Sequence, residues 1–459
     1  MKAWVLALGF TAIGMSAAAT ARAEQQGDGT DTGRVSHIEG TLFGRGPYDE
    51  EVSELAVNAI IRAGDEIFTD EGTFAELELP GETFLRLAGA TTVVVQRLDV
   101  NGAEIALADG AAYLSRGPDA APARFKSFAG TVDLGGRAMV RIGNDPQRTR
   151  LEIGVADGNA ELRDDRTAIT VRAGQRLVWT KGSTRDEVFR VKDGDAFDRW
   201  NDERERRVRG ANRPQHVARG VMGSYELDGH GTWVLIDGYW AWRPTVVVSW
   251  RPYRHGYWSW CEPYGWTWVS YEPWGYTTSH YGRWYYRAHY GWVWYPDAYW
   301  GPAWVVWAGF GPYLGWAPCD FWGRPIYVHS YYSYYDYGAW CYTDAHYFYY
   351  GGGYYYRHDY RRRRTTTTTT REPYATSSGR SAGAGRGGGG GIGRDGKYQI
   401  REFDRETIAK YTPVPVKDAR ADLTPKHIVA AADRGALKGP ARGARSGDFL
   451  ERQVRDPEG

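Results

Sequence analysis

Three Trp-x-Trp motifs that follow one another at a spacing of 26 residues are the part of this sequence whose residue types could support binding chemistry. Side chains two apart on a strand project from the same face, so each motif would present two rings together. Exposed rings in a flat row would form a platform for a ligand such as a glycan, whereas buried rings would form a core. Core packing, a ligand platform and self-association through exposed rings are the three interpretations. The candidate ligand-binding residues are Trp240, Trp242, Trp266, Trp268, Trp292 and Trp294.

The sequence contains two partial matches to catalytic motifs, and each lacks a feature that its chemistry requires. Residues 379–383 fit the Gly-x-Ser-x-Gly pattern but lack the strand and helix that a nucleophile elbow needs. Residues 391–397 have the spacing of a phosphate-binding loop, but Tyr398 stands where that loop needs Ser or Thr. We therefore expect no catalytic residues, no metal site, no cofactor and no enzymatic activity. The acids that a hydrolase hypothesis would test first are Glu226, Asp228, Glu262 and Glu272.

The first 23 residues have the pattern of an export signal. Lys2 precedes an apolar run from Ala3 to Met15, and residues 21–23 read Ala-Arg-Ala, a small-residue cleavage pattern. We expect residues 1–23 to be removed and the mature protein to have no transmembrane segment. A retained anchor and an outer-membrane barrel are the less favoured alternatives.

The three cysteines all lie in the aromatic part of the chain, and export determines whether they can be oxidised. An exported protein meets oxidising conditions, so one disulfide is expected. Pairing of Cys319 with Cys341 would leave Cys261 free, but the sequence leaves the connectivity open.

The elements that position the rings form an internal repeat. Residues 225–356 hold 18 of the 21 tryptophans, and the three Trp-x-Trp motifs named above recur every 26 residues. Such a period indicates a repeat architecture, and aromatic residues between glycine and proline turns favour β-hairpins. We expect an aromatic-rich β-hairpin repeat domain over residues 215–320, followed by a Tyr-rich extension over 321–356.

A second all-β region precedes the rings. Residues 24–33 are polar and expected to be disordered, and short alternating runs from 34 to 182 predict a β-sandwich or β-roll domain. Residues 104–110 are similar to residues 152–158, and both end in Asp-Gly, which suits a hairpin turn.

Charged and low-complexity segments complete the chain. Residues 183–214 include interleaved acids and arginines, typical of a solvated linker helix. Residues 357–459 combine arginine, threonine and glycine runs with a net charge of +9, and they predict a disordered basic tail. The fold class is therefore mostly β.

The pattern over residues 34–182 resembles the FecR domain of Gram-negative bacteria. The resemblance rests on residues 64–69 (Gly-Asp-Glu-Ile-Phe-Thr), 84–87 (Phe-Leu-Arg-Leu) and the two Ala-Asp-Gly segments. In that family a periplasmic β domain follows a membrane helix and a cytoplasmic anti-sigma segment, and the proteins are sensors. Here an export signal precedes the β domain, so we expect no cytoplasmic segment to reach a sigma factor.

The aromatic stretch resembles a Trp/Tyr-rich bacterial domain of unknown function that commonly follows FecR domains. The motifs are residues 250–256, 264–270, 272–275, 280–284 and 315–318. We expect an exported envelope protein, periplasmic or at the cell surface, that binds or scaffolds an envelope protein or polysaccharide. A FecR-type sensory or regulatory protein and a self-associating structural protein are the alternatives. We do not expect nucleic acid as a partner, and the oligomeric state is left open.

Overall fold

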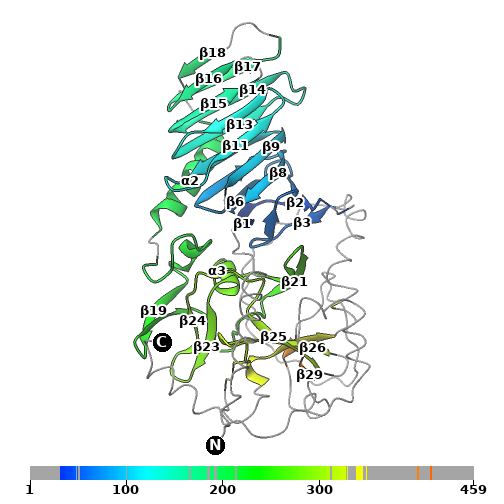
Figure 1. Cartoon of the computed structure of the whole chain (residues 1–459), viewed down its shortest axis with the longest axis vertical. Helices are drawn as coiled ribbons and strands as arrows, with labels where there is room; N and C mark the ends of the chain where they lie inside the picture. Colours follow the sequence, from blue (N-terminus) through cyan, green and yellow to red (C-terminus); the bar gives the residue numbers. More distant parts are fainter. Residues whose placement is uncertain are drawn as a thin grey trace, which may run out of the picture.

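Two β domains lie one after the other along the molecule, which is described here as a computed structural model (Figure 1). We call residues 32–190 the β domain and residues 224–344 the aromatic domain. The structure describes residues 31–344 except 48, 50–51, 100, 165–166, 183–186, 191–193, 212–213, 311–312, 327 and 329–336, together with 348, 401–402 and 414–415.

The β domain consists of two nine-stranded sheets. The first has the order β18 (Glu187–Arg190), β17 (Gln175–Thr180), β14 (Arg150–Asp157), β13 (Ala138–Asn144), β10 (Ala111–Arg116), β7 (Thr83–Leu87), β6 (Phe74–Leu79), β1 (Thr32–Glu39) and β4 (Ile60–Arg62). The second has the order β16 (Ala168–Arg172), β15 (Asn159–Arg163), β12 (Gly130–Leu134), β11 (Ala123–Ser127), β9 (Gly102–Asp109), β8 (Thr92–Asp99), β5 (Glu66–Thr69), β2 (Leu42–Arg45) and β3 (Ser53–Glu54).

The chain passes repeatedly between these sheets, which confirms the predicted sandwich or roll. Neighbouring strands are antiparallel except β9 and β11, and inward-facing Val, Leu and Ile side chains form one aliphatic core. This is the expected outcome of alternating strands that each bury one face.

At the two Asp-Gly pairs, 109–110 and 157–158, the chain passes from one sheet to the other. The prediction of hairpin turns at these positions is wrong. β9 and β10 belong to different sheets, as do β14 and β15, so Gly110 and Gly158 each mark a passage between sheets. Both glycines have positive φ, and a Cβ on Gly158 would lie 2.3 Å from the carbonyl oxygen of Arg137. Only glycine allows this close approach.

Helix α2 (Ala196–Gly210) follows the β domain where a helix was predicted. Asp195 and Asp198 form a capping box at its start, which fixes where the helix begins. The expectation of a solvated linker is wrong, because Asn201 and Arg204 are buried against the first sheet.

The aromatic domain is built from four consecutive hairpins. A four-stranded sheet has the order β19 (Gly231–Ile236), β20 (Tyr239–Pro244), β24 (Gly291–Tyr295) and β23 (Arg283–Arg287). β21 (Gly256–Cys261) and β22 (Gly265–Ser270) form a separate hairpin. The last sheet has the order β28 (Arg401–Glu402), β27 (Cys341–Asp344), β26 (Tyr313–Pro318), β25 (Val305–Phe310) and β29 (Val414–Pro415). Short helices are η1 (Ser224–Leu227), α3 (Gly275–His280) and η2 (Tyr337–Ala339).

A glycine packed on a tryptophan explains the repeat. A Cβ added to Gly231 would lie 2.5 Å from the indole of Trp242, and one added to Gly256 would lie 2.6 Å from that of Trp268. Gly282 stands in the same relation to Trp294, at 2.7 Å. The first three hairpins therefore begin at a glycine, because the ring near the far end of each one occupies the space of a side chain.

The predicted extension and tail contribute strands to the last sheet. β27 comes from residues 321–356 and pairs with β26, while β28 and β29 come from residues 357–459. Most of the tail, residues 1–30, and the motifs at 379–383 and 391–397 lie outside the described residues. Within the described part, no helix has the length and apolar character needed to cross a membrane.

The predicted disulfide between Cys319 and Cys341 is not formed, and all three cysteines are free and buried. Cys341 is in register with Trp316, three residues before Cys319. Three residues along a strand span about 10 Å, beyond the roughly 7 Å over which Cα atoms can be bridged. Burial raises the pKa of Cys261 to about 11, so this thiol is held in its unreactive protonated form.

Candidate functional site: the joint between the two domains

Most of the predicted ligand-binding rings belong to the core of the aromatic domain. Trp242, Trp268, Trp292 and Trp294 are buried, Trp266 is half-buried against Phe348, and Trp240 is 42 % exposed. They pack with other rings in edge-on and tilted pairs, such as Trp258 and Trp268 at 5.2 Å. The structure therefore does not bring these six rings together as a flat exposed row.

The predicted acids do not converge either. Burial raises the pKa of Glu272, which accepts hydrogen bonds from Ser270 and from Trp250 Nε1 (2.8 Å). Glu226 is buried 3.6 Å from Arg207, whereas the Glu262 carboxylate accepts from Trp260 at a surface. Asp228 closes the η1 turn. Among the described residues, no three His, Cys, Asp or Glu side chains are grouped as metal ligands.

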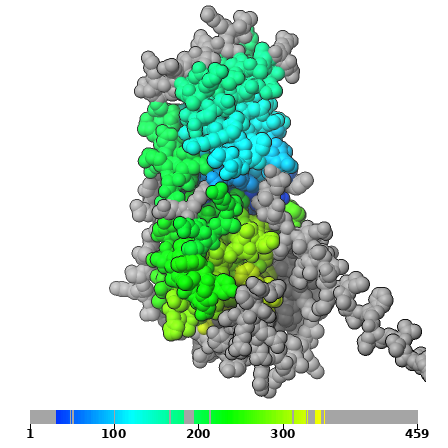
Figure 2. Space-filling model, turned by 60° about the vertical axis from the view of Figure 1, so that its left-hand side comes forward, coloured from blue at the N-terminus to red at the C-terminus, as the bar shows by residue number. Residues whose placement is uncertain are grey.

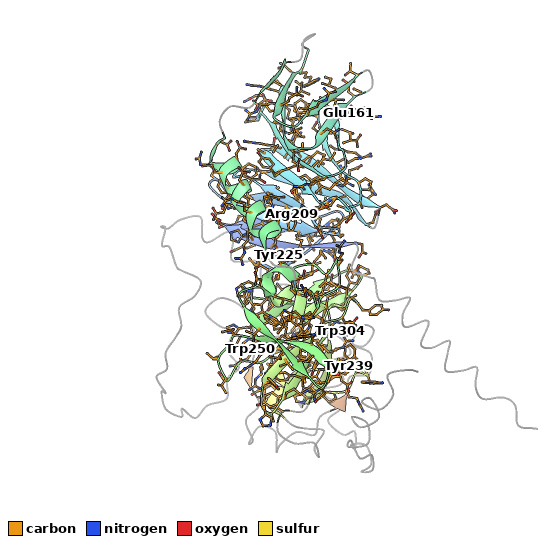
Figure 3. All side chains as sticks on the ribbon, turned by 90° about the vertical axis from the view of Figure 1, so that its left-hand side faces the viewer. Glu161, Arg209, Tyr225, Tyr239, Trp250 and Trp304 are labelled. Carbon is orange, nitrogen blue, oxygen red and sulfur yellow. The ribbon has the colours of Figure 1, made fainter. Side chains whose placement is uncertain are left out.

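Charged side chains gather instead where the two domains meet, a level marked by Tyr225 and Arg209 in Figure 3. Arg34 on β1 is fully buried there. Its Nε donates to Glu78 Oε2 at 2.7 Å, and its Nη1 donates to Asn58 Oδ1 at 2.9 Å. Its Nη2 donates to the hydroxyl of Tyr225, in the aromatic domain, at 3.0 Å. The guanidinium also lies 5.5 Å from the ring centroid of Tyr276, so both domains surround one cation.

The backbone at Gly223, the residue just before the aromatic domain, completes this contact. The amide of Gly223 donates to Glu78 Oε2 at 3.0 Å, next to the bond from Arg34. Gly223 has a φ of 73°, and a Cβ at this position would lie 3.1 Å from the guanidinium carbon of Arg34. Burial raises the pKa of Glu78 despite these two donors, so the carboxylate depends on Arg34 to remain charged.

A second buried ion pair lies beside the first and binds helix α2. Glu76 is fully buried and accepts from Arg86 Nε and Arg204 Nη2, both at 2.8 Å. Burial would raise the pKa of Glu76, but the two arginines outweigh it and lower that pKa to about 2. Arg86 continues the network to α2 through Asn201 (2.8 Å) and Glu205 (2.9 Å).

Peripheral hydrogen bonds widen the joint. Asn58 Nδ2 donates to the carbonyl oxygens of Ser270 (3.0 Å) and Glu272 (2.8 Å), and Arg62 Nη1 donates to that of Glu262 (3.0 Å). In the space-filling view the blue and green surfaces meet at this level (Figure 2). Such a network holds two bodies in one orientation.

Sequence reasoning missed this joint. Glu76 and Glu78 alternate with apolar residues on β6, and this alternation predicts that both side chains point to solvent. In the structure both are buried. The available signal was the charge of the helix: arginines of α2 face glutamates of the sheet, as Arg204 faces Glu76.

Family comparisons agree with this division of the chain. A sequence model of the family described as "FecR protein" matches residues 65–161. The chain carries a FecR domain. A second model, described as "Family of unknown function (DUF6600)", matches residues 224–323, from η1 to just beyond β26. The FecR domain is thus followed by this second domain, as predicted, and Glu76 and Glu78 lie within the FecR match.

Solved structures give only distant likeness. Two crystal structures of a candidate anti-sigma factor from Parabacteroides distasonis are similar to part of the chain. One has 15 % identity and a TM-score of 0.24, covering 36 % of this chain and 72 % of its own. The other has 11 % identity and a TM-score of 0.27, covering 39 % and 99 %. A comparison of the sequence with curated proteins finds no match.

Proposed function

We propose that this protein is an exported, non-enzymatic, FecR-type regulatory protein of the cell envelope that acts by binding a protein partner. The FecR match over residues 65–161 supports the regulatory role. The observation that carries the proposal is the burial of Arg34 between Glu78 of one domain and Tyr225 of the other. A partner that binds the aromatic domain would thereby act on a body fixed to the FecR domain.

A protein partner fits the described surface better than a polysaccharide. Four of the six candidate rings are buried, so stacking on sugars would require the core to open. The predicted envelope location, periplasmic or at the cell surface, is part of this proposal, as is the absence of a cofactor. Nucleic acid is not the proposed partner.

Gene deletion with complementation tests the regulatory role. Deleting the gene in its host should change a restricted set of transcripts, and the wild-type protein should restore them. A copy without residues 1–23 should not restore them, because the proposed site of action lies outside the cytoplasm. A transcriptome that is unchanged on both deletion and overexpression would contradict the proposal.

The joint provides a matched pair of variants. Arg34→Met should fail to restore the transcripts at equal protein level, because it breaks the joint while leaving the surface of both domains unchanged. Arg45→Met removes a surface arginine paired with Glu66 and should restore them fully. If both variants complement equally, the joint has no part in regulation.

A further inference from the structure

Strand β19 is an outer edge of the four-stranded sheet of the aromatic domain. The strand order is β19-β20-β24-β23, and within the described residues no strand pairs with the outer side of β19. In an antiparallel pair, alternate residues direct their N–H and C=O groups away from the partner. With respect to the other described strands, β19 therefore presents a row of unpaired backbone groups, and Figure 1 shows this strand at the side of the molecule.

This edge lacks the features that usually prevent strand addition. Its sequence is Gly-Thr-Trp-Val-Leu-Ile, which contains no charge and no proline. The opposite edge, β23, ends at Arg287, which is partly exposed. Natural proteins protect free edges with charged residues, proline or bulges, so an uncharged apolar edge indicates a strand that pairs with another chain.

A row of tryptophans ends at the same edge. Trp284, Trp294, Trp242 and Trp233 are in register across all four strands of the sheet. Leu235, two residues from Trp233 and on the same face of β19, is 54 % exposed. Another strand placed on β19 would continue the row and cover Leu235.

We propose that β19 pairs antiparallel with β19 of a second copy of this chain, forming a two-fold dimer with a continuous eight-stranded sheet. An uncharged strand pairs with itself without bringing like charges together, which makes it self-complementary. Charge at the hairpin ends favours the same arrangement. Asp237 lies in the turn and Arg243 at the other end of the hairpin, both exposed. Antiparallel pairing brings the Asp237 end of one copy to the Arg243 end of the other.

The test is the oligomeric state of the full mature chain, measured by sedimentation velocity over a hundredfold range of concentration. We expect a dimer for the wild type and at least a tenfold weaker dimer for Leu235→Lys, which places two lysines at the shared edge. Thr232→Lys, on the other face of the same strand, is the second variant and should act similarly. Circular dichroism and the thermal midpoint check that each variant is folded.

Val247→Lys is the matched control, because Val247 is an exposed apolar residue (72 %) in the loop after β20 and outside the strand. It should leave the dimer unchanged. Hydrogen exchange should slow at residues 231–236 when the protein is concentrated from monomer to dimer. The proposal is overturned if the wild type stays monomeric, if the dimer survives both β19 substitutions, or if Val247→Lys also loses the dimer. It is also overturned if hydrogen exchange at residues 231–236 does not change with protein concentration.

Discussion

Arg34, near the start of the β domain, donates a hydrogen bond to the hydroxyl of Tyr225, 191 residues further along the chain, over 3.0 Å. The same guanidinium is paired with Glu78, and all three side chains are buried. Because a buried charge is costly without its partner, this arrangement makes the orientation of each domain a condition for the stability of the other.

Arg34→Met should destabilise the protein by about 3–5 kcal/mol, because Glu78 would be left buried without its counter-ion. Urea unfolding at neutral pH measures the loss. The control Arg45→Met breaks a partly exposed pair with Glu66 and should cost less than about 1 kcal/mol. The double variant Arg34→Met with Glu78→Gln should regain part of the loss, and equal stability of Arg34→Met and Arg45→Met would refute the prediction.

Gly256→Ala should destabilise the aromatic domain by about 3 kcal/mol through overpacking. A Cβ at this position would lie 2.3 Å from the carbonyl oxygen of Val269 and 2.6 Å from the Trp268 ring. The matched control is Gly210→Ala at the end of α2, where nothing lies within 4 Å of the added carbon. The control should leave stability unchanged or raise it by up to about 1 kcal/mol. Thermal unfolding of both variants measures the difference. A Gly256→Ala protein as stable as the control would show that packing against Trp268 is not the reason for glycine at the start of the hairpin.

Acidification should destabilise the protein through His280. Burial lowers the pKa of His280 to about 4 from an unfolded value of 6.5, so the unfolded chain binds its proton first. The contribution is present above pH 6.5 and is lost as pH falls through 4, by a total of roughly 3 kcal/mol. Urea unfolding of wild type and His280→Gln at pH 7 and pH 4 measures this difference. A wild type that loses no more stability than His280→Gln would contradict the assignment.

Sugars should not change the tryptophan fluorescence of the mature protein. Because most rings are buried, a panel of envelope polysaccharides and peptidoglycan fragments should give a flat response, and acrylamide should quench only a minor part of the emission. Trp240→Ala should remove part of the quenchable fraction. A saturable shift that Trp266→Ala abolishes without unfolding would establish a glycan platform instead.

The elements of this fold are largely visible in the sequence, because each follows a local rule. Alternation over residues 74–79 predicts β6, and the Gly-to-Trp spacing from Gly256 to Trp268 predicts a hairpin. The Trp-x-Trp spacing likewise allows an aromatic core, because two rings two positions apart on a strand lie on the same face.

The joint could not be predicted, because no local period reveals what covers the polar face of a strand. Glu76 and Glu78 have the pattern of exposed residues, and only the docking of α2 and of residue 223 converts them into buried partners. Similarly, Asp-Gly before Ala111 suits a hairpin locally, but the next strand belongs to the other sheet. The register that separates Cys319 from Cys341 is a further long-range property.

Calorimetry of the mature full-length protein tests most directly whether the two domains act as one body. We expect a single transition whose van't Hoff enthalpy equals its calorimetric enthalpy for the wild type. In Arg34→Met we expect this peak to move to lower temperature and to separate into two. Two transitions in the wild type, with one left unchanged by Arg34→Met, would show that the domains are independent and would contradict the account.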